Sequence, residues 1–250
     1  MPKELTHLIV SAGALEKVEK KSLGAAGILK ENLDLFMVGS LICDTAYYHI
    51  PVFNKKSILC ISQAIHNARG DLNKEVIARL TKNEEQCSPD RHFAFLCGVL
   101  SHHITDRAFH PPVIYLTGDY HAKDAQERHF AEARHRFLEG LIDGHLAKGS
   151  NLDLELKKDG EAEIKREKTV LHPLLLSFVY AALPQIDHKK AEEMALRLFK
   201  LSGLQLALLK LYNKSYFRSF ILNTNRLFRF RLSNYAAMLY PAAGGLKMPL

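Results

Sequence analysis

The sequence predicts an all-α fold, a single compact domain of many helices, and three observations support that class. Apolar residues recur three and four positions apart, the helical spacing, along most of the 250 residues. Alternating β-branched runs, which are typical of strands, are scarce. Apolar residues make up 47% of the chain and charged residues 24%, so a chain of this length can bury a sizeable core.

The helices are expected where this periodicity is clearest, and they are expected to stop near prolines. Pro51, Pro89, Pro111, Pro112 and Pro184 lie between the predicted helices. The adjacent pair at 111 and 112 is expected to end the helix that carries the polar cluster described below. The expected helices span residues 12–20, 30–46, 55–69, 72–83, 91–108, 122–147, 171–182, 188–211 and 213–232.

Two segments differ from the rest in composition. Residues 171–186, LHPLLLSFVYAALPQI, are the most apolar stretch, but Pro173 and Pro184 bracket only ten residues. This is too short for a bilayer span and predicts a buried core helix. Residues 148–168 are rich in charge and poor in apolar side chains, which predicts an exposed excursion from the domain.

Positive charge is concentrated at one end of the chain. Residues 194–250 contain nine Lys or Arg and no Asp or Glu, so this segment carries +9 although the whole chain carries +7. Its basic and aromatic composition fits an anionic membrane surface or a nucleic acid, and a solvated helix face would have the same composition. The sequence leaves this choice, and the oligomeric state, open.

The cellular location is predicted from the N-terminal residues and the cysteines. The first twenty residues contain no basic stretch followed by a long apolar one, so no signal peptide is expected. The four cysteines form no Cys-x-x-Cys pair and have apolar neighbours, which is typical of free thiols in a reducing compartment. A cytoplasmic protein is expected, and secretion without a leader is left open.

The most concentrated group of chemically active side chains is SHHITDRAFHPP, residues 101–112, which follows the apolar run FAFLCGVL. His102, Asp106 and His110 are four residues apart, so they share one stripe of a helix. A carboxylate buried on such a stripe needs compensation, and a divalent cation supplies it. A hydrogen-bonded His–Asp–His group near a helix end is the alternative.

The neighbours of this stripe indicate its direction. Phe95 and Val99 precede it at the same spacing, which predicts that the three polar side chains face the core. His103 is rotated from the stripe by about 100°. It is therefore expected either beside the ligands, without contacting a metal, or at the surface.

A second pair has the same spacing. His135 and Glu139, in RHRFLEGLIDGH, are four residues apart, and Leu138, Ile142 and Leu146 share their face. The pair is therefore expected to point inward, either as metal ligands or as a buried ion pair.

Three further candidates are dispersed along the chain. His7 precedes an apolar run, Asp44 follows one in MVGSLICDTAYY, and His66 lies near the inner face of its helix. Each is more often structural when alone, but together they would complete a site that holds more than one metal. No P-loop and no Gly-x-Ser-x-Gly elbow is present, which excludes those two kinds of site.

The chain resembles the zinc-dependent phospholipase C family in the order of five features, which are His7, Asp44, His66, SHHITDRAFHPPVIYLTG and HRFLEGLID. Relatives in this family include bacterial enzymes that hydrolyse phosphatidylcholine, and a more distant branch contains zinc-dependent single-strand nucleases. The resemblance covers residues 1–145 by motif and the remainder by length and helical character. It implies an all-α fold with up to three zinc ions between the helices.

The resemblance also implies a role for each candidate residue. Asp44 would be the catalytic residue that orients or deprotonates the attacking water. Secreted relatives complete a third zinc site with the amino end of a chain that begins with Trp, whereas this chain begins Met1-Pro2, so two zinc ions are expected and the third is left open. The implied metal ligands are His66, His102 and Asp106, with Asp44 nearby, for one ion, His110, His135 and Glu139 for another, and His7, bridged by Asp106, for the third.

The resulting hypothesis is a zinc metallohydrolase that cleaves a phospholipid, or another phosphodiester, with a zinc-activated water. Its products from a phospholipid would be diacylglycerol and a phosphorylated head group. Two alternatives stay open at this point. One is a zinc-dependent nuclease that acts on single strands, and the other is a non-enzymatic helical domain that a metal stabilises and that binds a partner.

Overall fold

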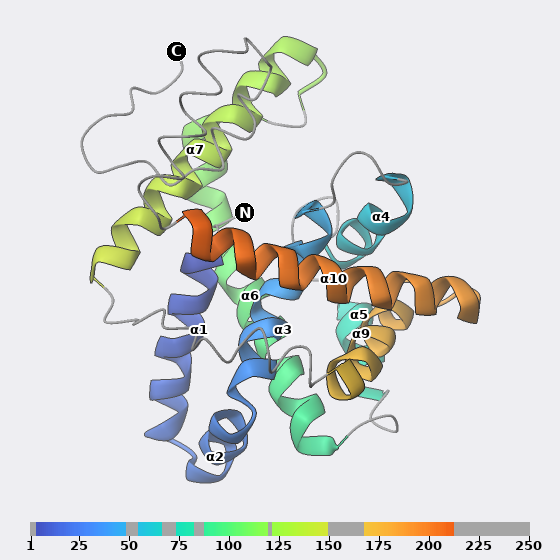
Figure 1. The fold of residues 1–250 in the computed structure, drawn as a ribbon. Coiled ribbons are helices and arrows are strands. Elements are labelled where there is room, and N and C mark those ends of the chain that lie inside the picture. The colour runs from blue at the N-terminus through green and yellow to red at the C-terminus, as the bar shows by residue number, and fades with distance from the viewer. Residues whose placement is uncertain are drawn as a thin grey trace. The chain divides into compact units, whose positions relative to one another are not determined.

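The regular structure of the chain is helical throughout the residues that the computed structural model describes, which are 4–48, 55–66, 74–82, 88–119, 122–149 and 168–212 (Figure 1). This confirms the all-α prediction. The elements are α1 (Glu4–Glu19), α2 (Leu23–Glu31), α3 (Leu33–Thr45), the 3₁₀ helix η1 (Ala46–Tyr48), α4 (Lys55–Ile65), α5 (Lys74–Lys82), α6 (Pro89–Thr117), α7 (Ala125–Gly149), α9 (Lys168–Ala182) and α10 (His188–Tyr212).

The chain divides into two compact units. Unit 1 contains Met1–Ile9, Thr105–Leu152 and Ala207–Leu250, and unit 2 contains Val10–Ile104 and Asp153–Leu206. Helices α1, α6 and α10 each continue from one unit into the other, whereas α7 belongs to unit 1 alone. That residues 1–250 form a single domain stays a prediction.

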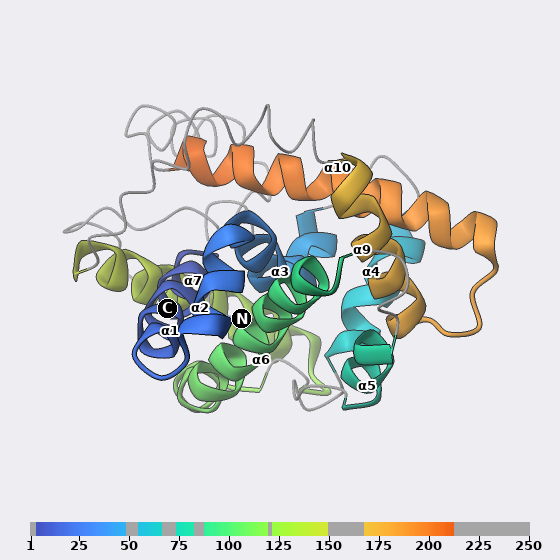
Figure 2. The same ribbon diagram turned by 90° about the horizontal axis from the view of Figure 1, so that it is seen from below.

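The core of unit 2 follows the helical spacing of its apolar residues. Ile58, Ile61 and Ile65 line one face of α4 and are at most 3% exposed. Phe178 of α9 packs edge-on against Phe95 of α6, with ring centroids 6.1 Å apart. Helix α5 lies beside α9 in this unit (Figures 1 and 2). Burying each such side chain stabilises the fold by about 1.5–3 kcal/mol.

Helices α3 and α6 cross at two glycines within unit 2. A Cβ atom at Gly39 would collide with the carbonyl oxygen of Phe95, and a Cβ atom at Gly98 would collide with that of Phe36. Glycine lacks this atom, so the two backbones can approach closely. The crossing places the second half of α3 beside the part of α6 that follows Gly98 and carries His102.

Helix α1 begins at Glu4, so the start predicted at residue 12 is wrong. The carboxylate of Asp143 in α7 accepts hydrogen bonds from the backbone N–H groups of Leu5 and Thr6. These groups belong to the first turn of α1 and have no acceptor within the helix. A distant side chain thus replaces the local N-cap that marks a helix start in a sequence.

The single helix predicted over residues 30–46 is also wrong, because Asn32 separates α2 from α3. Its backbone has φ −120° and ψ 37°, outside the helical region, and its side-chain amide donates a hydrogen bond of 2.9 Å to the carbonyl of Ile28. With this local bond α2 ends at Glu31, and α3 begins at Leu33 after the single residue Asn32.

Helix α6 continues through Pro111 and Pro112, so the prediction that this pair ends the helix is wrong. Both prolines are exposed, as are Arg107 and Ala108, whose carbonyls lose their usual helical donors. Water can solvate those carbonyls on an exposed face. The opposite face stays buried as far as Thr117, which is 3% exposed, and that burial favours the longer helix.

Two predicted segments lie outside the described residues. The charged excursion over 148–168 is described only at its ends, where α7 ends at Gly149 and α9 begins at Lys168. The helix predicted over 213–232 lies wholly outside.

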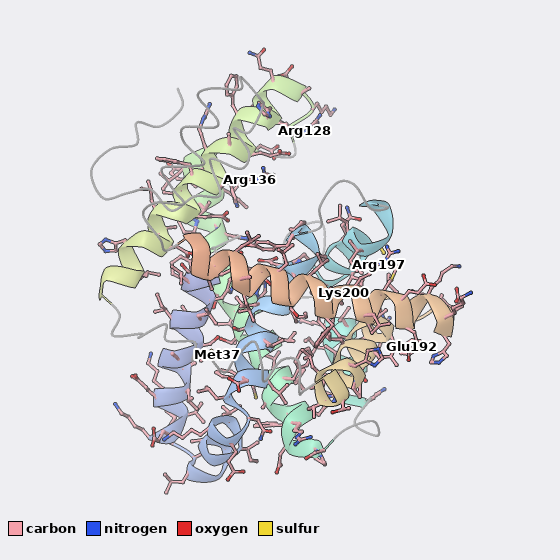
Figure 3. The ribbon with its side chains drawn as sticks, viewed as in Figure 1. Met37, Arg128, Arg136, Glu192, Arg197 and Lys200 are labelled. Carbon is pink, nitrogen blue, oxygen red and sulfur yellow. The ribbon has the colours of Figure 1, made fainter. Side chains whose placement is uncertain are left out.

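Part of the basic segment 194–250 is described, namely residues 194–212 of α10. Figure 3 shows Arg197 and Lys200 on this helix, where the first is half-buried and the second exposed. The anionic surface proposed for this segment stays a prediction. Within the described ranges, no helix has both the length and the apolar character that a bilayer crossing requires.

Candidate metal centres

Helix α6 carries three buried polar side chains on one face. His102, Asp106 and His110 are 0%, 0% and 7% exposed, and they lie four residues apart in a continuous helix. Phe95 and Val99 precede them on this stripe and are at most 1% exposed. The stripe therefore faces inward, as its spacing predicts.

The first candidate centre, the Asp44 cluster, consists of Asp44, His66 and His102 and lies within unit 2. It joins the last turn of α3, the residue after α4 and the middle of α6. Nε2 of His66 lies 3.9 Å from Oδ1 of Asp44, and Nε2 of His102 lies 3.8 Å from Oδ2. One ligand atom from each residue lies within 4.8 Å of the other two.

Backbone carbonyls fix both imidazoles of the Asp44 cluster. Nδ1 of His102 lies 2.8 Å from the carbonyl oxygen of Ser40, and Nδ1 of His66 lies 3.0 Å from that of Ser62. A carbonyl can only accept, so each Nδ1 carries the proton and donates it. Each Nε2 then presents a lone pair on the side of the Asp44 carboxylate, the arrangement that a cation stabilises.

His103 lies beside the Asp44 cluster, which is one of the two positions expected for it. It is 4% exposed, its ring centroid lies 5.4 Å from that of His66, and its Nε2 lies 3.8 Å from Sγ of Cys43. Phase placed it off the stripe, but the middle of α6 is buried on more than one face. A usable signal was the lack of charged side chains between residues 101 and 105.

The second candidate centre, the Glu139 cluster, consists of His110, His135 and Glu139 and lies within unit 1. Nε2 of His135 is 2.8 Å from Oε1 of Glu139, and the rings of His135 and His110 are 5.9 Å apart. All three residues are at most 7% exposed. Their ligand atoms also lie within 4.8 Å of one another.

Burial keeps the imidazole of His135 neutral. Burial, with smaller contributions from the nearby His110 and Arg136, lowers the pKa of His135 from 6.5 to about 2. Figure 3 shows Arg136 on α7. Nη2 of Arg136 lies 3.9 Å from Oε2 of Glu132. A neutral imidazole has a lone pair available for a metal at any physiological pH.

His7 and Asp106 form a further buried pair in unit 1. Nε2 of His7 lies 3.5 Å from Oδ1 of Asp106, and Nε2 of His110 lies 3.9 Å from the same oxygen. Asp106 is thus between two imidazoles within this unit. Its predicted bridging of a zinc ion held with His66 and His102 stays a prediction.

The donor chemistry of both clusters fits zinc. Each offers two imidazole nitrogens and one carboxylate oxygen, which is the ligand set of several catalytic zinc sites. Soft thiolate ligands are absent from both, and sets made only of oxygen atoms, which magnesium and calcium prefer, do not occur in them.

One family model matches the chain. The sequence model of a family described as zinc dependent phospholipase C matches residues 6–192. The chain belongs to the zinc-dependent phospholipase C family. The matched range contains all eight candidate residues, from His7 to Glu139, and the predicted membership of the family is thereby confirmed. The assignment of these residues as ligands stays a prediction. Neither the curated proteins nor the solved structures give a match.

Membership in the zinc-dependent phospholipase C family agrees with the geometry in two respects. The family is all-α, as the described chain is. It uses zinc, and the two clusters of this chain can hold metal ions.

Proposed function

We propose that the protein hydrolyses the phosphodiester bond of a phospholipid on its glycerol side and releases diacylglycerol and a phosphorylated head group. One observation carries this proposal. The chain matches the zinc-dependent phospholipase C family and gathers two sets of zinc-type ligands, the Asp44 cluster and the Glu139 cluster, from segments far apart in the sequence.

Each cluster would hold one zinc ion, and His7 with Asp106 is the candidate pair for a third. Zinc, when bound, supplies a Lewis acid that acidifies water and polarises phosphoryl oxygens. The protein's contribution is to hold neutral imidazole nitrogens and carboxylate oxygens in place. The carbonyls of Ser40 and Ser62 do this for His102 and His66.

Asp44 is the proposed catalytic residue. Its side chain is 13% exposed, whereas that of Asp106 is fully buried, so Asp44 is the more accessible of these two carboxylates. In the proposed reaction Asp44 orients the attacking water and accepts its proton. The water oxygen forms a bond to phosphorus, and the glycerol oxygen leaves with diacylglycerol and takes up a proton.

The test is an assay of the full chain on phosphatidylcholine vesicles, with single-stranded DNA as a parallel substrate. Zinc-loaded protein is expected to release diacylglycerol and a phosphorylated head group from the vesicles. A strong chelator should abolish this release, and added zinc should restore it. Full activity in excess chelator, or cleavage of the DNA but not the lipid, would contradict the proposal.

Two substitutions on α7 distinguish the loss of a proposed metal ligand from a change elsewhere on that helix. His135→Ala removes a proposed ligand and is expected to lower turnover by about 100-fold or more, because even groups that only orient zinc ligands are worth about 10–100-fold. His129→Gln is the matched control, since His129 is an exposed histidine of the same helix. It should keep the parent activity.

A further inference from the structure

Asp143 continues the buried stripe of α7 that carries His135 and Glu139. It follows His135 and Glu139 at the same four-residue spacing, so the three side chains share one face of the helix. The residue is 0% exposed. A carboxylate so deeply buried needs specific donors, and the structure supplies them from another helix.

The donors come from the first turn of α1. The backbone N–H of Leu5 donates to Oδ2 of Asp143 at 3.1 Å, and the backbone N–H of Thr6 donates to Oδ1 at 3.0 Å. The hydroxyl of Thr6 donates a further hydrogen bond to Oδ1. The negative charge also lies at the positive end of the helix dipole. Asp143 therefore caps the N-terminus of α1, although it lies 137 positions from Thr6 in the sequence.

The residue after Thr6 is His7, whose Nε2 lies 3.5 Å from Oδ1 of Asp106. We propose that Asp143 is a positioning residue that fixes the first turn of α1 so that His7 reaches Asp106, and that it thereby sets the zinc affinity of the His7 position. Both oxygens of Asp143 accept hydrogen bonds from α1, and Asp143 belongs to neither candidate cluster, so the proposal assigns its effect to His7 rather than to direct ligation. The inference rests on the proposed zinc binding and names the residue that controls one part of it.

The experiment measures zinc bound per chain as a function of free zinc, in buffers of defined zinc activity, for the full chain. His7→Ala is expected to remove one equivalent from the parent curve. Asp143→Asn keeps the size of the side chain but places an amide N–H₂ opposite one of the α1 donors. It is expected to raise the free zinc needed to fill that same equivalent by about 10-fold or more. The double variant should bind as His7→Ala does.

Asp187→Asn is the matched control for a change of Asp to Asn at the N-terminus of a helix. Oδ1 of Asp187 accepts the backbone N–H of Lys190 at 3.0 Å in the first turn of α10, far in sequence from every proposed ligand. This variant should keep the parent zinc curve. Thr6→Val removes only the hydroxyl donor and should shift the same equivalent by a smaller factor, so it decides the question if Asp143→Asn does not fold.

Three results would overturn the inference. The first is a zinc-binding curve of Asp143→Asn that equals the parent curve or, where that variant does not fold, such a curve for Thr6→Val. The second is an effect of Asp143→Asn that persists when His7 is already Ala, and the third is a His7→Ala variant that binds as much zinc as the parent. The readout is zinc, not turnover. If the zinc curves behave as expected but no lipid is cleaved, the proposed function alone fails. If lipid is cleaved and Asp143→Asn leaves the zinc curve unchanged, this inference alone fails.

Discussion

At the scale of single residues, the candidate centres depend on carboxylates that are buried beside imidazoles. Asp106 is the extreme case, because it is fully buried and its Oδ1 lies between His7 and His110. Removing an ionised carboxylate from water costs several kcal/mol unless positive charge compensates it. A bound metal ion would supply such compensation at Asp106.

Asp106→Asn tests this directly, because it keeps the shape and removes the charge. Zinc affinity and phospholipid turnover are each expected to fall by about 100-fold or more. In the metal-free protein the same change should leave the free energy of unfolding equal or higher, since a buried charge is gone. Zinc titration and urea unfolding measure the two effects, and parent-like zinc binding by the variant would refute the assignment of Asp106 as a ligand.

A pH dependence of the metal-free protein follows from His135. Its pKa is lowered from 6.5 to about 2 by burial, so between these values the unfolded chain binds a proton that the folded chain does not. The free energy of unfolding should therefore fall as the pH drops below about 6.5, by up to about 1.4 kcal/mol per pH unit from this group. Urea unfolding of the metal-free parent and of His135→Leu, from about pH 8 to about pH 5, measures the difference. If the free energy of unfolding falls equally steeply with pH in the two proteins, the prediction for His135 is wrong.

Sequence spacing found single residues only where the partner lies on the same helix or in a known motif. His102, Asp106 and His110 were predicted because four-residue spacing defines a face. Asp143 has that spacing after Glu139 and was still missed as a polar member of the stripe. Its donors are two backbone N–H groups and the Thr6 hydroxyl of α1, more than 130 residues away, and no spacing pattern in the sequence predicts them.

At the scale of elements, the sequence located most helices but not all of their ends. The apolar periodicity of α4, α5, α9 and α10 was sufficient to place them to within a few residues. The wrong ends have three kinds of cause. The start of α1 is fixed by the distant carboxylate of Asp143. Asn32 makes a local side-chain bond that competes with the helix, whereas α6 continues past Pro111 because burial of its inner face outweighs the lost hydrogen bonds.

The crossing of α3 and α6 gives a stability prediction. Gly98→Ala places a methyl group against the backbone of α3 and is expected to lower the free energy of unfolding by about 1–3 kcal/mol. Gly203→Ala is the matched control, because Gly203 lies inside α10 and a Cβ there meets nothing within 4 Å. It should raise the free energy of unfolding by up to about 1 kcal/mol through helix propensity. Urea unfolding at constant metal content checks both variants. An unchanged free energy of unfolding for Gly98→Ala would contradict the prediction, because it would show that the two helices can separate without cost.

At the scale of the whole molecule, one helix connects the chemistry to the fold. Helix α6 contributes His102 to the Asp44 cluster in unit 2 and His110 to the Glu139 cluster in unit 1. The other ligands come from α3, from the end of α4 and from α7. The family match covers residues 6–192 and therefore includes every element that supplies these proposed ligands.

The most direct test of the proposed reaction is the position of a water oxygen in the products. Zinc-loaded protein is given phosphatidylcholine vesicles in water enriched in oxygen-18, and the products are identified by mass spectrometry. Attack of water on phosphorus predicts one heavy oxygen in the phosphorylated head group and none in diacylglycerol. Phosphatidic acid with an unphosphorylated head group, released fatty acid, or the absence of any lipid product would contradict the account.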